Sequence, residues 1–168
     1  KQIISSRSFG QSVTELNVLK DAVSMFVANA CAKLRAQQGQ AALIQVFLLT
    51  NRHRQDQPQY SPSIAVPLPY PTSDSLEVNR WANYLVGKIF KSGYMYKKAG
   101  IVLSEITPVT QRQGDLLEPV TQTNEKLMLA LDTLNQRFGR GKVKVSTQGA
   151  YKQLQMKLER KSPHYTTD

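Results

Sequence analysis

The stretch AALIQVFLLT, residues 41–50, is apolar, rich in branched side chains, and bounded by Gly39 and by the polar run NRHRQDQPQ. A short apolar run between polar or turn-forming flanks predicts a buried β-strand. No apolar run in the chain approaches the roughly 20 residues that a membrane-spanning helix needs. The fold prediction therefore starts from a strand at this position.

The next apolar stretch, SIAVPLP at residues 63–69, predicts the partner of that strand. Ile64, Val66 and Leu68 alternate with other residues, so they share one face of an extended chain. The two prolines of the stretch fall on the other set of positions and cannot donate hydrogen bonds within a sheet, which favours an edge. We expect the two stretches to form a hairpin with a long loop.

A long helix is predicted before this hairpin. Residues 12–15, Ser-Val-Thr-Glu, have the form of a capping box, in which the hydroxyl and the carboxylate satisfy free backbone amides at a helix start. The helix is expected to end near Gln37 and Gly39. Its apolar face recurs at three- and four-residue steps and consists of Val13, Leu16, Leu19, Val23, Phe26, Ala30 and Leu34.

A second helix is predicted after the hairpin. Residues 74–77, Asp-Ser-Leu-Glu, offer another capping box, and Gly93 is a suitable C-terminal stop. Its apolar stripe consists of Val78, Trp81, Leu85 and Ile89.

Two further strands complete the pattern, QIISSRSF at residues 2–9, ended by Gly10, and AGIVLSEIT at residues 99–107, closed by Pro108. The order is then β-α-β-β-α-β, the ferredoxin-like α+β arrangement, a four-stranded antiparallel sheet with two helices on one face. The other face of such a sheet is free for binding.

This first domain is assigned to residues 1–108. After it, the sequence predicts a linker over 109–120 and a small C-terminal domain, or block, over 121–168. The block is expected to hold a helix at 123–139 with Leu127, Leu131, Leu134 and Phe138 on one face, followed by a half-exposed strand at 141–147. A block of this size is small for an independent core, so we expect it to lean on the first domain or on a partner.

The charge narrows the function. The 168 residues carry 22 basic and 12 acidic side chains, a net charge of +10, which favours a polyanionic ligand such as nucleic acid or an acidic membrane face. A basic surface without a ligand is the alternative.

Several chemistries find no support in the residues. His53 and His164 are too scattered for a metal site, and no phosphate-binding loop, nucleophile elbow or zinc-protease motif occurs. Cys31 lies in the apolar FVANACAKL and is expected to be a buried helix residue of a cytoplasmic protein. We expect no catalytic residue, metal or cofactor in this chain, which begins without Met and is interpreted as a fragment of a longer protein.

The stretch SSRSFG offers a binding motif. Hydroxyls at Ser6 and Ser8, the guanidinium of Arg7 and backbone amides of a strand are common donors to phosphate oxygens, and they position a duplex without reading its sequence. The alternative is an ordinary edge strand with one solvated arginine.

The segments SSRSFGQSVTELNVLKDAV, YKKAGIVLSEITP, LNQRFGRGKVKVSTQG and QMKLERKSPHYTT, taken together and in order, resemble the C-terminal half of UmuC-type translesion DNA polymerases. These are the Y-family catalytic subunits of bacterial DNA polymerase V and its plasmid-borne relatives, which act in the SOS response to DNA damage. The resemblance covers essentially the whole chain. It implies that the first domain is the little finger, whose open sheet face grips the DNA backbone.

The resemblance also implies roles for particular residues. Ser6, Arg7 and Ser8 would hold template phosphates of a primer–template, and Lys97 and Lys98 are plausible further contacts. Arg52 and Arg54 are added on charge and position only. The catalytic carboxylates and their magnesium ions would belong to a palm domain that lies N-terminal to this chain. If the DNA prediction is right, positive residues should gather on the helix-free side of the sheet.

The linker carries a second implied site. The family has a sliding-clamp-binding peptide similar to Gln-x-x-Leu-Phe, and Gln113, Gly114, Asp115, Leu116 and Leu117 lie at that place, with Leu in place of the final Phe. A few anchoring side chains of such a peptide give most of its affinity. The block after the linker is implied to contact a UmuD-type regulatory subunit or the RecA filament, although Leu154 and Leu158 depart from the family pattern.

Three other classes of function are compatible with parts of the sequence or can be compared with it. One is a protein-interaction module that binds acidic partners without touching DNA. An RNA-recognition module is disfavoured because neither central strand candidate shows the aromatic pattern that stacks bases. A small enzyme of acylphosphatase type would need an Arg and an Asn at a phosphate loop, and none is found.

Overall fold

The structure is a computed structural model that describes residues 1–109, 124–139 and 143. Its elements occur in the predicted order β-α-β-β-α-β, followed by one further helix. They are β1 (Gln2–Val13), α1 (Leu16–Ala36), β2 (Gly39–Thr50), β3 (Ser63–Thr72), α2 (Ser75–Ile89), β4 (Tyr96–Pro108) and α3 (Glu125–Phe138).

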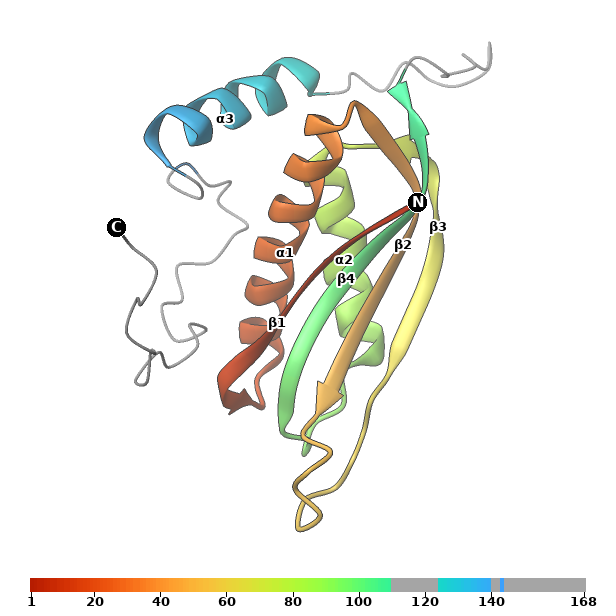
Figure 1. Ribbon diagram of the computed structural model, residues 1–168. Helices are drawn as coiled ribbons and strands as arrows, with labels where there is room; N and C mark the ends of the chain where they lie inside the picture. The colour runs from red at the N-terminus through yellow and green to blue at the C-terminus, as the bar shows by residue number, and fades with distance from the viewer. Residues whose placement is uncertain (110–123, 140–142, 144–168) are drawn as a thin grey trace, which may run out of the picture.

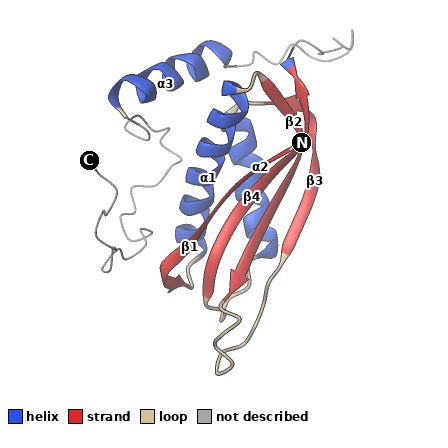
Figure 2. Cartoon of the chain, viewed as in Figure 1, coloured by secondary structure: helices blue, strands red, loops and turns tan. Residues whose placement is uncertain are grey.

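The four strands form one sheet in the order β1-β4-β2-β3 (Figure 2), and every neighbouring pair is antiparallel. Helices α1 and α2 cover the same face of this sheet (Figure 1). The α+β prediction is therefore confirmed, as is the β2–β3 hairpin with its long loop. Strand β3 lies at an edge, where its prolines cost no ladder hydrogen bond. The other edge is β1.

The register of the sheet separates its two faces. Residues directly opposite each other in an antiparallel pair share a face, and successive residues alternate between faces. One row across β1, β4 and β2 is Ile3, Leu103 and Ile44, all buried beneath the helices. The rows between these covered ones lie on the helix-free face: Gln2–Ser104–Leu43, Ile4–Val102–Gln45, Ser6–Gly100–Phe47 and Ser8–Lys98–Leu49.

The start of α1 differs from its prediction. The capping box predicted at residues 12–15 is wrong, because Ser12 belongs to β1 and the helix begins at Leu16, where Glu15 makes no side-chain cap. Strand β1 runs past Gly10 by way of a register shift between Ser8 and Val13. Pairing with β4 thus outweighs the local capping preference. The end of α1, at Gln37, is as predicted.

The start of α2 confirms Asp74 as the cap, but not the full capping box, because the backbone amide of Asp74 donates to the Thr72 hydroxyl at 3.1 Å and not to Glu77. The carboxylate of Asp74 accepts a hydrogen bond of 2.8 Å from the backbone amide of Leu76, which satisfies one free donor of the first turn. The helix ends at Ile89, earlier than Gly93 suggested, because Phe90 turns to an extended conformation. Gly93 adopts a φ of +88° in the turn that leads into β4, a conformation that suits glycine.

Gly100 allows an unusually close approach of neighbouring strands on the helix-free face. A Cβ atom placed on it would lie 2.4 Å from the Cβ of Ser6 and 2.5 Å from the ring of Phe47. The ring of Phe47 therefore covers the glycine, and its register partner Ser6 sits directly against it.

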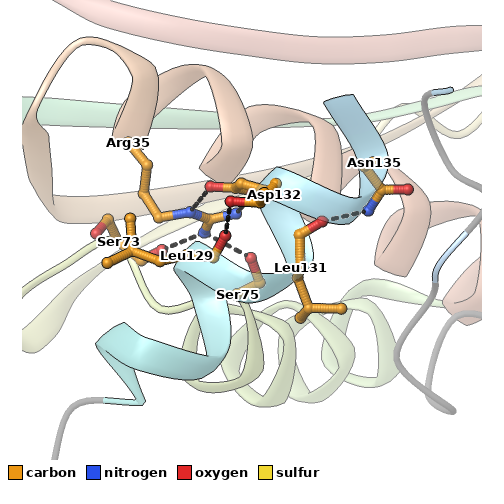
Figure 3. Close-up of polar contacts among 8 residues, drawn as sticks. Arg35, Ser73, Ser75, Leu129, Leu131, Asp132 and Asn135 are labelled. Atoms are coloured by element: carbon orange, nitrogen blue, oxygen red, sulfur yellow. Dashed lines mark hydrogen bonds and ion pairs between the residues drawn. The ribbon is translucent and has the colours of Figure 1, made fainter. Parts of the chain in front are cut away.

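Helix α3 packs against the first domain at the end where α1 finishes and α2 begins (Figures 1 and 3). The guanidinium of Arg35 donates two hydrogen bonds of 2.6 and 2.7 Å to the carboxylate of Asp132. It also donates to the carbonyl of Ser73 at 2.8 Å and to the hydroxyl of Ser75 at 2.9 Å. Met128, one turn before Asp132, is buried.

The leucine stripe predicted for this helix is not the face that packs against the domain. Leu127, Leu134 and Phe138 are exposed. The contact face instead carries Met128 and Asp132, one turn apart. Hydrophobic periodicity located the helix correctly, but the side that faces the domain carries Met128 and the partly buried ion pair of Asp132.

Several predicted features lie outside the described residues. These are the linker from residue 110 onward with its clamp peptide at 113–117, the strand at 141–147 apart from Val143, and the C-terminal residues beyond it. Within the part of the chain that the structure describes, no helix has the length and apolar character to cross a membrane. In the same part, no three His, Cys, Asp or Glu side chains are grouped closely enough to hold a metal ion.

Candidate nucleic-acid interface

The predicted phosphate-binding motif lies on the free edge of the sheet. Ser6, Arg7 and Ser8 are all exposed and belong to β1, whose only neighbour among the strands that the structure describes is β4. On its outer side, an edge strand leaves alternate backbone N–H and C=O groups without strand partners. The motif therefore combines hydroxyls, a guanidinium and backbone donors along one line.

The alternation of the strand divides this motif between two sides. Ser6 and Ser8 lie on the helix-free face, opposite Gly100 and Lys98. Arg7 is paired with the buried Ala99 and thus lies on the helix-covered side, at its rim. A ligand on the open face reaches the serines but not Arg7. Only a ligand that runs along the outer edge of β1 can be contacted by all three side chains.

The two lysines of β4 have different surroundings. Lys98 lies on the helix-free face between Ser8 of β1 and Leu49 of β2, and it is partly exposed. The ammonium of Lys97 donates a hydrogen bond of 3.0 Å to the carbonyl of Gly10, in the irregular part of β1. Lys98 is thus oriented toward a ligand on the open face, whereas Lys97 also holds the end of β1.

Arg52 and Arg54 lie in the loop between β2 and β3, beyond the sheet. Arg54 donates two hydrogen bonds of 2.9 Å to the carboxylate of Asp56. These bonds raise the pKa of Arg54 above its ordinary value and lower that of Asp56. Arg52 forms no ion pair with any side chain that the structure describes. The charge of Arg52 is therefore more available than that of Arg54.

Positive charge gathers at one end of the sheet and not over its open face. Lys98 is the only basic residue in the four helix-free rows of β1, β4 and β2. The centre of that face is uncharged, with Phe47, Val102 and Ile4 among its members. The end where β1 finishes and β4 starts carries the predicted cations Arg7, Arg52, Arg54, Lys97 and Lys98. Of the predicted cations only Lys98 lies on the helix-free face, so the expected gathering of positive residues there is wrong; the other cations lie around the end of the sheet.

The structure adds residues that the sequence did not single out. Lys91, in the turn before β4, places its ammonium 4.6 Å from the ring centre of Tyr60, and the Tyr60 ring packs 4.9 Å from that of Tyr94. All three lie at the same end of the sheet as the predicted cations. The segment KSGYMYKK, residues 91–98, is rich in aromatic and basic residues, which could have indicated these positions. Only Lys97 and Lys98 of this segment were predicted from the sequence as DNA contacts.

Cys31 confirms the prediction of a buried helix residue. It is fully buried in α1, and burial raises the pKa of its thiol to about 12. A thiol with such a pKa is protonated at neutral pH and is a poor nucleophile.

Two family models match this chain. The impB/mucB/samB family C-terminal domain matches residues 1–116. A domain of unknown function matches residues 125–168. The ion pair between Arg35 and Asp132 joins one matched region to the other.

Curated relatives match over nearly the entire chain. Protein ImpB of Salmonella typhimurium is 35% identical over 169 aligned residues, and protein UmuC of Salmonella typhimurium strain LT2 is also 35% identical over 169. Protein MucB of Escherichia coli is 34% identical over 170 residues. The match covers at least 99% of this chain but only 40% of each relative.

Solved structures share the fold at low sequence identity. An insertion ternary complex of Dbh DNA polymerase superimposes with a TM-score of 0.50 and 14% identity, covering 63% of this chain and 29% of that chain. DinB from Sulfolobus solfataricus superimposes with a TM-score of 0.50 and 13% identity, covering 64% and 29%. At these identities the likeness concerns the fold.

Proposed function

The chain belongs to the impB/mucB/samB family, and from that premise we propose that it is the DNA-holding C-terminal region of an error-prone translesion DNA polymerase. Membership confirms the resemblance drawn from the sequence motifs. The proposed ligand is the sugar–phosphate backbone of primer–template DNA, held without sequence specificity. The parent protein would act in the SOS response, in the cytoplasm at the nucleoid.

The observation that carries this proposal is the free edge of β1. Ser6 and Ser8 on one side, Arg7 on the other and the outward backbone groups between them form a line of donors. Lys98 adds a cation beside Ser8 on the open face. Such donors bind phosphate oxygens and leave base edges unread. We therefore place the backbone along the β1 edge, a narrower site than the open face as a whole.

We propose the same division of the chain as the sequence suggested, with a little finger domain over 1–108, a linker over 109–120 and a C-terminal domain over 121–168. The chain spans 40% of the length of its curated relatives. We propose that catalysis, with its carboxylates and magnesium ions, belongs to the remaining part of such a protein. In this interpretation the chain is not an enzyme by itself.

We further propose that the linker binds the DNA polymerase sliding clamp through Gln113, Gly114, Asp115, Leu116 and Leu117. The apolar pair would enter a hydrophobic pocket of the clamp, and the glutamine a polar site. A UmuD-type subunit and the RecA filament are proposed partners of the C-terminal domain.

Salt dependence tests the DNA proposal. The full chain is titrated with a fluorescent primer–template, and the logarithm of the affinity is plotted against the logarithm of the salt concentration. Each phosphate neutralised contributes about 0.9 to the slope. We expect Arg7→Glu to weaken binding and to reduce the slope.

The matched control is Arg80→Glu. Arg80 is exposed in the first half of α2, on a different element from β1, and the substitution changes the net charge by the same amount. Binding that ignores salt, or that responds equally to the two substitutions, contradicts a specific grip by β1. The first of these outcomes would favour the protein-interaction module.

The clamp proposal has a separate test. Replacement of Leu116 and Leu117 by alanine should abolish binding of the chain to the sliding clamp in an anisotropy assay. Leu117→Phe restores the family pattern and should tighten binding. Clamp binding that survives the double alanine variant rules out this peptide as the anchor.

A further inference from the structure

The two ends of the sheet differ strongly in charge. The end formed by residues 7–13, 51–62 and 90–98 carries six basic residues and one acidic residue, Asp56. The opposite end carries Asp74, Glu77 and Glu105, with Lys1 and Arg35. Helix α3 docks at that opposite end, so it leaves the basic end uncovered (Figure 1).

Lys91 is held in place at the basic end by the buried Tyr96. The backbone amide of Lys91 donates a hydrogen bond of 2.9 Å to the Tyr96 hydroxyl, and that hydroxyl donates one of 3.0 Å to the carbonyl of Lys91. Tyr96 is itself fixed in the sheet, where it pairs with Val13 of β1 and with Thr50 of β2. The backbone position of Lys91 is thus set by the core of the domain.

The side chain of Lys91 rests on an aromatic platform. Its ammonium lies 4.6 Å from the ring centre of Tyr60, which packs on Tyr94. The backbone amide of Tyr60 donates a hydrogen bond of 3.1 Å to the hydroxyl of Thr50, at the end of β2. An aromatic ring orients a cation without neutralising it. Lys91 is exposed and forms no ion pair within the described residues, so its full charge faces solvent.

The loop that carries Arg52 is ordered by Gln59. The side-chain amide of Gln59 donates to the carbonyls of Asn51, Arg54 and Gln57, at 3.1, 2.8 and 3.1 Å. Its carbonyl accepts a hydrogen bond of 2.7 Å from Thr50. The loop is therefore a fixed extension of the sheet end, and it presents Arg52 beyond the end of β2.

We propose that Arg52, Tyr60, Lys91 and Tyr94 form a second phosphate-binding patch for nucleic acid, separate from the β1 edge. This inference rests on the proposed DNA-binding function and names a further site for it. Lys91 is held over the ring of Tyr60 and Arg52 is carried by an ordered loop, and neither cation has a carboxylate partner among the described residues. The ligand class is a phosphodiester backbone.

The position of the patch suits a duplex that already contacts β1. Strands β1 and β2 are separated only by β4, so their ends lie about 10 Å apart. Along the axis of a DNA duplex, one strand rises by about 3.4 Å per phosphate. A backbone held at Ser8 and Lys98 can therefore pass over this end within about three phosphate steps.

The test uses the full chain and the same primer–template titrations. Lys91→Gln and Arg52→Gln should each weaken binding and lower the salt slope by about 0.9, and by about twice that together. Lys91→Arg keeps the charge on the platform and should keep the slope. The matched control is Lys88→Gln, since Lys88 also lies over a tyrosine, 5.3 Å from the ring of Tyr84, but on helix α2.

The outcomes separate this patch from the β1 edge. If Lys91→Gln and Arg52→Gln leave the slope unchanged while Arg7→Glu reduces it, the patch is refuted and the edge stands. If Lys88→Gln loses as much DNA affinity and salt slope as Lys91→Gln, the patch is also refuted, because the change in net charge alone then explains the effect. If the unaltered chain binds without salt dependence, the DNA proposal itself fails. Thermal unfolding followed by circular dichroism checks that each variant keeps its fold.

Discussion

The ion pair between Arg35 and Asp132 gives the sharpest prediction about how helix α3 is held. Alanine is placed at each position singly and then at both, which forms a double-mutant cycle. A second cycle uses Arg54 and Asp56, another pair in which an arginine donates two hydrogen bonds to one carboxylate. The two pairs share their chemistry and differ in burial.

The expected size of the effect follows from that difference. The side chains of Arg35 and Asp132 are 14% and 23% exposed, whereas those of Arg54 and Asp56 are 55% and 61% exposed. Removing one partner of a fully buried pair costs about 3–5 kcal/mol, because the other charge is left uncompensated. The Arg35 pair is mostly but not fully covered, and Arg35 keeps its bonds to Ser73 and Ser75. We therefore expect Asp132→Ala to cost about 2 kcal/mol.

Hydrogen exchange of the backbone amides of α3 measures the loss of docking free energy directly at this helix. A loss of 2 kcal/mol in the docking of α3 should speed exchange of its backbone amides about 30-fold, because each 1.4 kcal/mol or so is a factor of ten. The core amides of β4 should change much less. The coupling between Arg54 and Asp56, measured by urea unfolding, should fall within experimental error, since water screens an exposed pair.

Two results would refute this reasoning. Unchanged exchange in α3 after Asp132→Ala means that Met128 and other contacts hold the helix. Equal coupling in the two cycles means that burial does not set the strength of these pairs. High salt offers an independent check, because a covered pair should respond to it less than an exposed one.

Three further predictions concern the first domain. Gly100→Ala should lower the free energy of urea unfolding by about 1–3 kcal/mol, because its methyl group overpacks the strand interface, whereas Gly87→Ala, with open space around it on α2, should raise stability by up to about 1 kcal/mol. Cys31 should resist a thiol reagent at pH 8 until the chain unfolds. Because the folded-state pKa of Cys31 is raised from 9.0 to about 12, its stability contribution is complete below about pH 9 and is lost as the pH rises toward 12; Cys31→Ala should lack that part of the pH dependence. Asp74→Ala removes the α2 cap and should cost about 1 kcal/mol by thermal unfolding, and Asp74→Ser should restore most of it.

Much of the fold could be predicted from the sequence, because each element carries its own period. The apolar run at 41–50 and the alternation at 63–69 gave the hairpin, and three- and four-residue spacing gave the helices. Local chemistry also located the cap of α2 at Asp74. It failed at residues 12–15, where the capping box competes with pairing between β1 and β4 that no local pattern reveals.

Only part of the candidate DNA-binding site could be predicted from the sequence. Its residue types and their position on a strand indicated phosphate binding at Ser6, Arg7 and Ser8. The face of each side chain depended on the register with β4, which places Arg7 against Ala99 on the covered side. The pairing of Arg54 with Asp56 was predictable in principle, because the two residues are only two positions apart in the loop.

The sequence by itself thus determined the elements, their order, the basic character and the family motifs, because these depend on neighbours along the chain. Only the tertiary structure decided the order of the strands, the division of the serines and Arg7 between two sides of β1, and the gathering of charge at one sheet end. It alone paired Arg35 with Asp132, 97 residues away, and brought Lys91 over Tyr60. Contacts between distant residues follow from packing and register, which no stretch of sequence encodes alone.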